Sequence, residues 1–143
     1  MRVRILGVDV GRRRVGLAIS DPSGTLARPL TTLSIAGETA VERVAQEIEK
    51  LKSDADGLDA VVVGRPARLD GSASEQTSEV ASFVSRLRAR ITVPVHEEDE
   101  RLSSREAESR LALRQRDWRK RKARLDAAAA AVILQDYLDR RST

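Results

Sequence analysis

The stretch LDAVVVG, residues 58–64, constrains the fold of this chain more than any other segment. Its unbroken apolar and β-branched character is typical of a central parallel strand that is covered on both faces. In the preceding segment, residues 38–51, Val41, Val44 and Ile48 follow one another at three- and four-residue steps, which indicates an amphipathic helix. A helix that leads into such a strand favours a parallel pairing, so we expect an α/β sheet covered by helices on both faces.

The beginning of the chain predicts three antiparallel strands ahead of that helix. RVRILGVDV reads as a buried strand and RVGLAISD as an alternating strand, with GRRR as the turn between them, and ARPLTTLSI forms a weaker third strand. Later elements are predicted as a helix at 75–91, a strand at 91–99, a helix at 104–115, a polar basic connector at 116–124 and a terminal helix at 125–141. This order describes a mixed sheet, and we expect a single domain over residues 1–143.

Residue types that are missing limit the chemistry open to the chain. It has no Cys and a single His, His96, so disulfide frameworks, zinc clusters and Cys or Ser/His nucleophile systems lack their parts. Any metal ion must then be held by oxygen atoms. No stretch approaches the ~18 apolar residues that cross a bilayer, so we expect a cytoplasmic protein without a membrane partner.

Positive charge is concentrated in one segment of the chain. Between Arg101 and Arg124, ten Arg or Lys residues stand against Glu106, Glu108 and Asp117, whereas the net charge of the whole chain is only +4. Such a stretch favours contact with a polyanion, although a solvated helix face is the commoner cause of charge runs.

Three groups of acids occupy positions that need an explanation. Asp9 ends an apolar strand, where an ionised carboxylate is costly unless it pairs with an arginine of the following turn or binds a cation. HEEDER, residues 96–101, follows another strand at the edge where open α/β sheets place their sites, although an exposed turn also tolerates such a run. Asp126 opens the predicted terminal helix, and its ordinary role there is to cap the helix.

These acids form one cluster of oxygen ligands if the strand ends and the helix start converge. Such a cluster suits Mg²⁺ or Mn²⁺, and two ions about 4 Å apart could activate a water and stabilise the leaving oxygen in phosphodiester hydrolysis. The basic tract fits this chemistry because arginines attract the phosphate backbone. The only aromatic residues are Phe83, Trp118 and Tyr137, so recognition of shape and phosphate should dominate over base stacking.

Four blocks of the sequence resemble the YqgF family, also called RuvX, whose members are described as pre-16S ribosomal RNA nucleases or as Holliday junction resolvases. In chain order the blocks are LGVDVGRRRVGLAISD, VVVGRPARLDGS, DERLSSREAE and RLDAAAAAVILQDYLD. The resemblance implies a ribonuclease H-like fold, in which a five-stranded mixed sheet has three antiparallel strands followed by parallel additions. It also implies divalent-metal catalysis on nucleic acid.

Carried over residue by residue, the resemblance implies a set of site residues. The implied catalytic residues are Asp9, Asp99, Glu100 and Asp126. Asp9, Glu100 and Asp126 are the implied metal ligands, although Asp99 could take the place of Glu100 as the second ligand. Gly64, Pro66, Asp70 and Gly71 match a family loop near the site. The residues expected to contact nucleic acid are Arg12, Arg13, Arg14, Arg65, Arg68, Arg101, Arg119, Lys120, Arg121, Lys122 and Arg124.

The sequence departs from the family pattern in two places. The turn after the first strand usually carries a small hydroxyl residue and a lysine, whereas here it carries three arginines. The loop that is commonly Leu-Pro-Leu-Asn-Met-Asp-Gly reads RPARLDG. Both changes add arginine to the expected substrate face, which strengthens phosphate attraction and leaves the substrate open.

The leading hypothesis is a metal-dependent endonuclease that processes the 5′ end of pre-16S ribosomal RNA, with ribosome-assembly components as further partners. One alternative is the same chemistry on branched DNA in recombination, and another is a non-catalytic RNA-binding assembly factor. ATPases of the actin or hexokinase type also open with a strand, an Asp-x-Gly and a hairpin, but their domains are much longer. The sequence does not indicate an oligomeric state.

Overall fold

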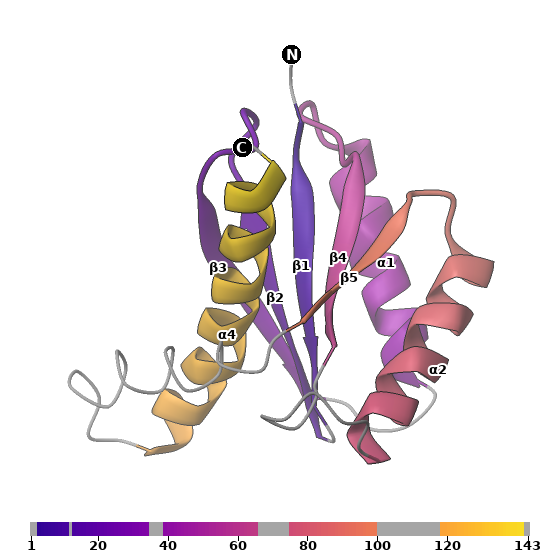
Figure 1. Ribbon diagram of the computed structural model, residues 1–143, viewed down its shortest axis with the longest axis vertical. Coiled ribbons are helices and arrows are strands. Elements are labelled where there is room, and N and C mark those ends of the chain that lie inside the picture. Colours follow the sequence, from indigo (N-terminus) through magenta and orange to yellow (C-terminus); the bar gives the residue numbers. More distant parts are fainter. Residues whose placement is uncertain (1–2, 12, 35–38, 66–74, 100–117, 142–143) are drawn as a thin grey trace.

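The computed structural model describes residues 3–11, 13–34, 39–65, 75–99 and 118–141, with the backbone alone at 39, 75–77, 99 and 118–126. Within these residues the elements follow the predicted order (Figure 1). They are β1 (Ile5–Val10), β2 (Arg14–Ser20), β3 (Ala27–Ser34), α1 (Thr39–Ser53), β4 (Ala60–Arg65), α2 (Glu75–Arg90), β5 (Val95–Asp99) and α4 (Trp118–Arg141). The helix predicted at 104–115 lies outside the described residues.

The five strands form one mixed sheet in the order β3-β2-β1-β4-β5. The pairs β1–β2 and β2–β3 are antiparallel, whereas β1–β4 and β4–β5 are parallel. The Val-rich run therefore lies beside β1 at the centre of the sheet, which confirms the prediction. The predicted last strand is shorter than expected, because β5 begins only at Val95.

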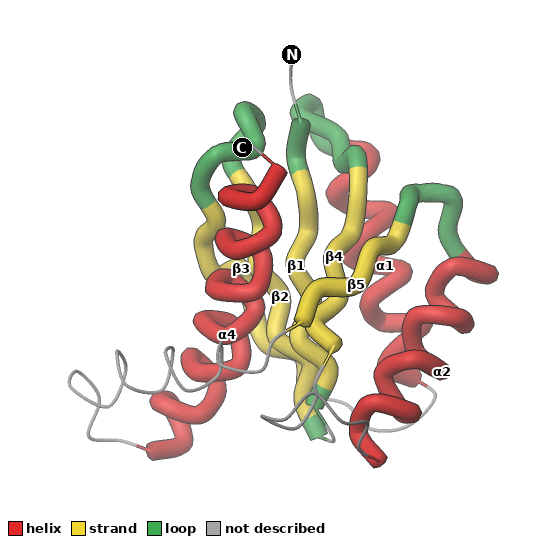
Figure 2. The backbone as a smooth tube through the Cα atoms, in the orientation of Figure 1, coloured by secondary structure: helices red, strands yellow, loops and turns green. Residues whose placement is uncertain are grey.

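Helices cover both faces of the sheet, with α4 on one face and α1 and α2 on the other (Figure 2). Side chains alternate along β1 between these two layers. Leu6 and Val8 belong to the core beneath α1 and α2, whereas Ile5 packs with Leu134 and Leu138 of α4. Gly7 and Asp9 consequently share the α4 face with Ile5.

The hairpin between β1 and β2 turns tightly at Gly11. The Gly11 N–H donates a hydrogen bond of 2.8 Å to the Arg14 carbonyl, and Val10 pairs with Val15. A Cβ at position 11 would lie 2.8 Å from that same carbonyl oxygen, so only glycine fits here. The predicted turn is thus confirmed.

Helix α4 begins earlier than the sequence pattern predicted. The segment 118–124 was expected to be part of a connector, but its backbone is helical. Arg, Lys, Ala and Leu are strong helix formers, and neither Gly nor Pro interrupts residues 118–141. Asp126 therefore lies inside the helix, and the cap role expected for it is wrong. None of the three described helices combines the length and apolar character that a membrane span requires.

Candidate active site

Asp9 lies at the carboxyl end of β1, on the face of the sheet that α4 covers. It is half-buried, and its partner across the hairpin is Gly16. Because glycine has no side chain, β2 adds no side chain to this face directly beside Asp9. The strand register thus places one acid in a partly water-accessible position at the end of a central strand.

The register continues from Asp9 across the two parallel strands. Val8 pairs with Val63, so Asp9 is level with Gly64, and Gly64 pairs in turn with Glu98 of β5. Two strand spacings separate the backbones of Asp9 and Glu98 by roughly 10 Å. Because Gly64 is a glycine, β4 contributes no side chain to the row between these acids.

Helix α4 brings position 126 to the level of Asp9. The helix runs antiparallel to β1, since Ala130 and Leu134 lie against Gly7 whereas Leu138 packs with Ile5. One helical turn back from Ala130, ~6 Å along the helix, is Asp126. Two residues forward from Gly7, ~7 Å along the strand, is Asp9. The backbone therefore places these two positions at about the same level along the sheet, on the face that α4 covers.

The expected second acid is described only in part. The backbone of Asp99 ends β5 and pairs with Arg65 at the end of β4, at the same edge as Asp9. Glu100 lies outside the described residues. Among the side chains that are described, no three Asp, Glu, His or Cys residues gather in a way that could hold a metal ion. That set includes Asp9 but not the side chains of Asp99, Glu100 or Asp126.

Several residues expected to contact nucleic acid lie at this edge. Arg13 is exposed in the β1–β2 turn, Arg14 is half-buried at the start of β2, and Arg65 is exposed at the end of β4. The backbone of Arg119–Arg124 forms the first turns of α4, which lie at the end of the sheet toward which β1 points (Figure 1). Arg12, Arg68 and Arg101 lie outside the described residues, as do the loop residues Pro66, Asp70 and Gly71.

Glu98 is a buried acid of the HEEDER run to which the family resemblance assigned no role. Only 7% of its side chain is exposed, and its Oε1 forms an ion pair with Nη1 of Arg140 in the last turn of α4. Two residues earlier on the same strand, the His96 ring stacks on Tyr137 of α4 with the ring centroids 5.8 Å apart. Strand alternation predicts that His96 and Glu98 share a face, but only the position of α4 shows what they contact.

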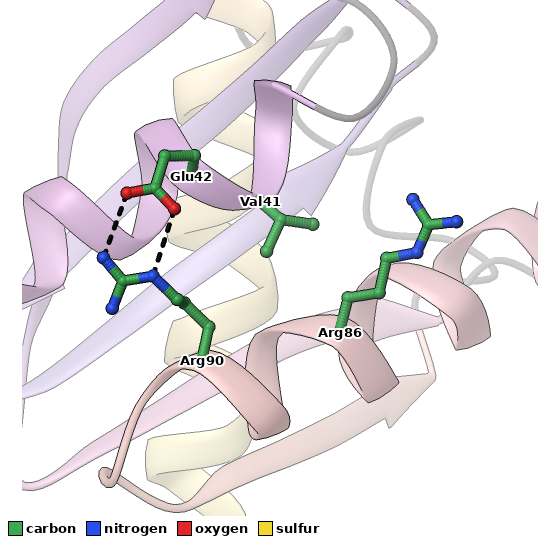
Figure 3. Close-up of a pocket in the computed structure, with 4 residues that line it drawn as sticks. All are labelled: Val41, Glu42, Arg86 and Arg90. Atoms are coloured by element: carbon green, nitrogen blue, oxygen red, sulfur yellow. Dashed lines mark hydrogen bonds and ion pairs between the residues drawn. The ribbon is translucent and has the colours of Figure 1, made fainter.

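A groove of about 480 Å³ lies between α1 and α2 (Figure 3). These two helices cover the face of the sheet opposite to Asp9. It is lined by Val41, Glu42, Arg86 and Arg90. Arg90 donates hydrogen bonds of 3.1 and 3.0 Å to the Glu42 carboxylate, which lower the pKa of Glu42 and raise that of Arg90. This ion pair joins the two helices and lies away from the row of acids.

Comparisons with known proteins agree over nearly the whole chain. A family model described as "RuvX: Holliday junction resolvase" matches residues 3–140. A relative from Anaeromyxobacter dehalogenans (strain 2CP-C), named "Putative pre-16S rRNA nuclease", is 43% identical over 144 residues, which cover 98% of this chain and 99% of the relative. A relative of the same name from Roseiflexus sp. (strain RS-1) is 39% identical over 137 residues, with 95% and 94% covered.

A solved structure of similar fold matches nearly the whole chain. Thermus thermophilus RuvC in complex with a Holliday junction substrate has a TM-score of 0.52 and 16% identity, with 98% of this chain and 96% of that chain covered. At this identity the likeness concerns the fold alone. The arrangement of five strands and flanking helices is therefore ribonuclease H-like, as the sequence predicted.

Proposed function

The chain belongs to the RuvX family, and from this premise we propose that it is a metal-dependent endonuclease that processes the 5′ end of pre-16S ribosomal RNA. Relatives at about 40% identity that carry the name "Putative pre-16S rRNA nuclease" match it over nearly their full length. This correspondence in length supports the same biochemical class for the whole chain.

One observation supports the proposal: positions 9 and 126 lie at about the same level on one face of the sheet. We infer that Asp9, Asp126 and one acid of the Asp99–Glu100 pair hold Mg²⁺ or Mn²⁺. The donor set fits these ions, which prefer carboxylate oxygen, because the chain has no Cys and its single His is stacked on Tyr137. Bound there, divalent ions would supply an activated water and stabilise the charge of the leaving oxygen.

The arginines at the same edge bind and orient the substrate in this proposal. Arg13 and Arg65 are exposed beside the ends of β1 and β4, where a phosphate backbone approaching Asp9 would pass. The basic turns at the start of α4 extend this positive surface. Phosphate contacts fix the position of a nucleic acid without reading its sequence, so this edge selects for backbone geometry.

Branched DNA is the second candidate substrate, because the matching family model is described as a Holliday junction resolvase. The acids would perform the same hydrolysis on either substrate. We favour the ribosomal RNA precursor because the relatives that match this chain over nearly their full length are named "Putative pre-16S rRNA nuclease".

A cleavage assay tests both substrates. The chain is incubated with Mg²⁺ and either a 16S RNA fragment that retains its 5′ extension or a four-way DNA junction, alongside Asp9→Asn and Asp126→Asn. Glu97→Gln serves as the matched control, since Glu97 is an exposed acid of β5. We expect wild type and Glu97→Gln to cut the RNA and both Asp variants to fail. Cutting of the junction alone would favour the DNA alternative, and equal inactivity of all four proteins would refute the nuclease assignment.

A further inference from the structure

The ion pair between Glu98 and Arg140 joins two elements that are far apart in the chain. Glu98 is 7% exposed near the end of β5, whereas Arg140 is 67% exposed in the last turn of α4. The pair therefore links a carboxylate inside the protein to a cation that reaches in from the surface. A buried carboxylate is costly without such a partner, so this arrangement needs the end of β5 to lie against α4.

Among the described strands, β5 lies at the edge of the sheet and pairs with β4 alone. Its first residue is held by α2, because Nη2 of Arg88 donates a hydrogen bond of 2.7 Å to the Val95 carbonyl. Its later residues contact α4 through the stacking of His96 on Tyr137 and through the ion pair of Glu98. The contacts with α4 thus act on the part of β5 that leads into the expected second acid.

The two elements joined by the pair both carry acids of the proposed site. Asp99 follows Glu98 directly on β5, and Asp126 belongs to the same helix as Arg140. A displacement of the end of β5 relative to α4 would therefore change the separation between the second acid and position 126. Bound divalent ions tolerate little such change, because Mg²⁺ in particular demands near-ideal ligand geometry.

We propose that the Glu98–Arg140 pair positions the acid at the end of β5 relative to Asp126, and so sets the affinity of the site for divalent ions. This inference rests on the function proposed above. Glu98 and Arg140 are positioning residues: they act through Asp99 or Glu100 and Asp126. Residues that orient metal ligands in this way typically change metal affinity about 10- to 100-fold when they are replaced.

The test measures Mn²⁺ affinity by titration calorimetry, without substrate, for wild type, Glu98→Gln, Arg140→Gln and the double variant. Thermal denaturation first fixes a temperature at which every variant is folded. We expect each single variant to raise the Mn²⁺ Kd roughly 10-fold. The double variant should bind Mn²⁺ no more weakly than the single variant with the lower affinity, because the two changes remove the same interaction.

Three matched variants separate positioning from general effects of charge. Glu97→Gln and Arg141→Gln remove exposed charges next to the pair, and both should bind Mn²⁺ as wild type does. Arg140→Lys keeps the positive charge and should restore most of the affinity that Arg140→Gln loses. A merely structural role would lower the melting temperature of the two single Gln variants and leave their Mn²⁺ Kd unchanged.

The possible results distinguish this inference from the proposed function. If wild type binds Mn²⁺ and Glu98→Gln and Arg140→Gln bind it equally well, the positioning role is wrong while the metal site stands. If Glu97→Gln and Arg141→Gln weaken binding as much as the paired residues do, general charge explains the effect and the positioning role is again wrong. If wild type binds no Mn²⁺, the proposed metal site is refuted, and the positioning role with it.

Discussion

Gly7 of β1 lies so close to Ala130 of α4 that a Cβ atom on Gly7 would come within 2.9 Å of the Ala130 carbonyl oxygen. The same Cβ would lie 2.8 Å from Cβ of Leu134. Asp9 follows Gly7 by two residues, and Asp126 precedes Ala130 by one helical turn. The close approach of strand and helix therefore sets the distance between the two positions that carry the proposed metal site.

Gly7→Ala should push α4 away from β1, because the backbone carbonyl cannot move aside without moving the helix. We expect a loss of about 1–3 kcal/mol in the free energy of unfolding, as for other overpacked cores, together with weaker Mn²⁺ binding. Denaturant unfolding and calorimetry measure the two quantities.

Leu134→Ala is the control for Gly7→Ala. It removes buried apolar volume beside the same glycine and should cost about 2–5 kcal/mol of stability, but it leaves the helix free to stay in place. Its Mn²⁺ Kd should therefore match that of wild type. Unchanged Mn²⁺ binding by a folded Gly7→Ala protein would show that this close approach does not set the geometry of the site.

The basic turns at 119–122 should bind phosphates of the substrate. Replacing these four Arg and Lys residues by Gln preserves a helix-forming sequence and removes four positive charges. We expect weaker RNA binding and a flatter dependence of log Kd on log salt, by roughly 0.7–0.9 units for each phosphate that the variant no longer neutralises. Fluorescence anisotropy in the Asp9→Asn background measures binding without cleavage. The control variant replaces Lys50 and Lys52, at the end of α1, by Gln. An unchanged salt dependence of the 119–122 variant would contradict the prediction.

Arg4 stabilises the end of the sheet that lies opposite to the proposed metal site. Its Nε donates a hydrogen bond of 2.6 Å to the Gly57 carbonyl, and its Nη2 donates one of 2.9 Å to the Leu51 carbonyl. Arg4→Leu should lower the free energy of unfolding by about 1–3 kcal/mol, because both carbonyls lose a partner. Mn²⁺ affinity should not change, since Arg4 precedes β1 at the end away from Asp9. The exposed Arg43 provides the control Arg43→Leu, and equal stability of the two variants would show that the Arg4 hydrogen bonds contribute little.

Asp21 should give the protein a stability that depends on pH. The Ser23 hydroxyl and the N–H groups of Leu26 and Thr25 donate hydrogen bonds to its carboxylate, which lower the pKa of Asp21 to about 2. Because the folded-state pKa is depressed, this stabilisation is complete above the usual value of 3.8 and is lost as the pH falls toward about 2.

The comparison with Asp21→Asn isolates this contribution. The difference in unfolding free energy between wild type and the variant should be constant above about pH 5 and should shrink as the pH falls through the Asp range. Glu79→Gln controls for the removal of one exposed negative charge on α2. A difference that stays constant from about pH 5 down to about pH 2 would mean that these hydrogen bonds do not favour the ionised form.

Local patterns in the sequence predicted most of the sheet and its helices. The Val run of β4 and the glycine turn at Gly11 depend on short-range chemistry, and both lie where that chemistry indicates. The spacing of Val44 and Ile48 likewise predicted the buried face of α1. In each case the residues that decide the structure are neighbours in the chain.

The start of α4 and the contacts of Glu98 could not be predicted in the same way. The segment 118–124 has no apolar period, so its charges suggested a solvated connector although each residue favours a helix. For the same reason the sequence pattern places Asp126 at the start of the helix, whereas the structure places it inside the helix. Glu98 pairs with Arg140, which is distant in the chain, and that ion pair depends on how α4 packs across the sheet.

Anomalous diffraction from crystals grown with Mn²⁺ tests most directly whether distant acids form one metal site. We predict a manganese peak about 2 Å from carboxylate oxygens of both Asp9 and Asp126, with an oxygen of Asp99 or Glu100 completing the set. A structure in which Asp9 and Asp126 share no ion, with each carboxylate instead paired to its own arginine, would contradict the proposed site.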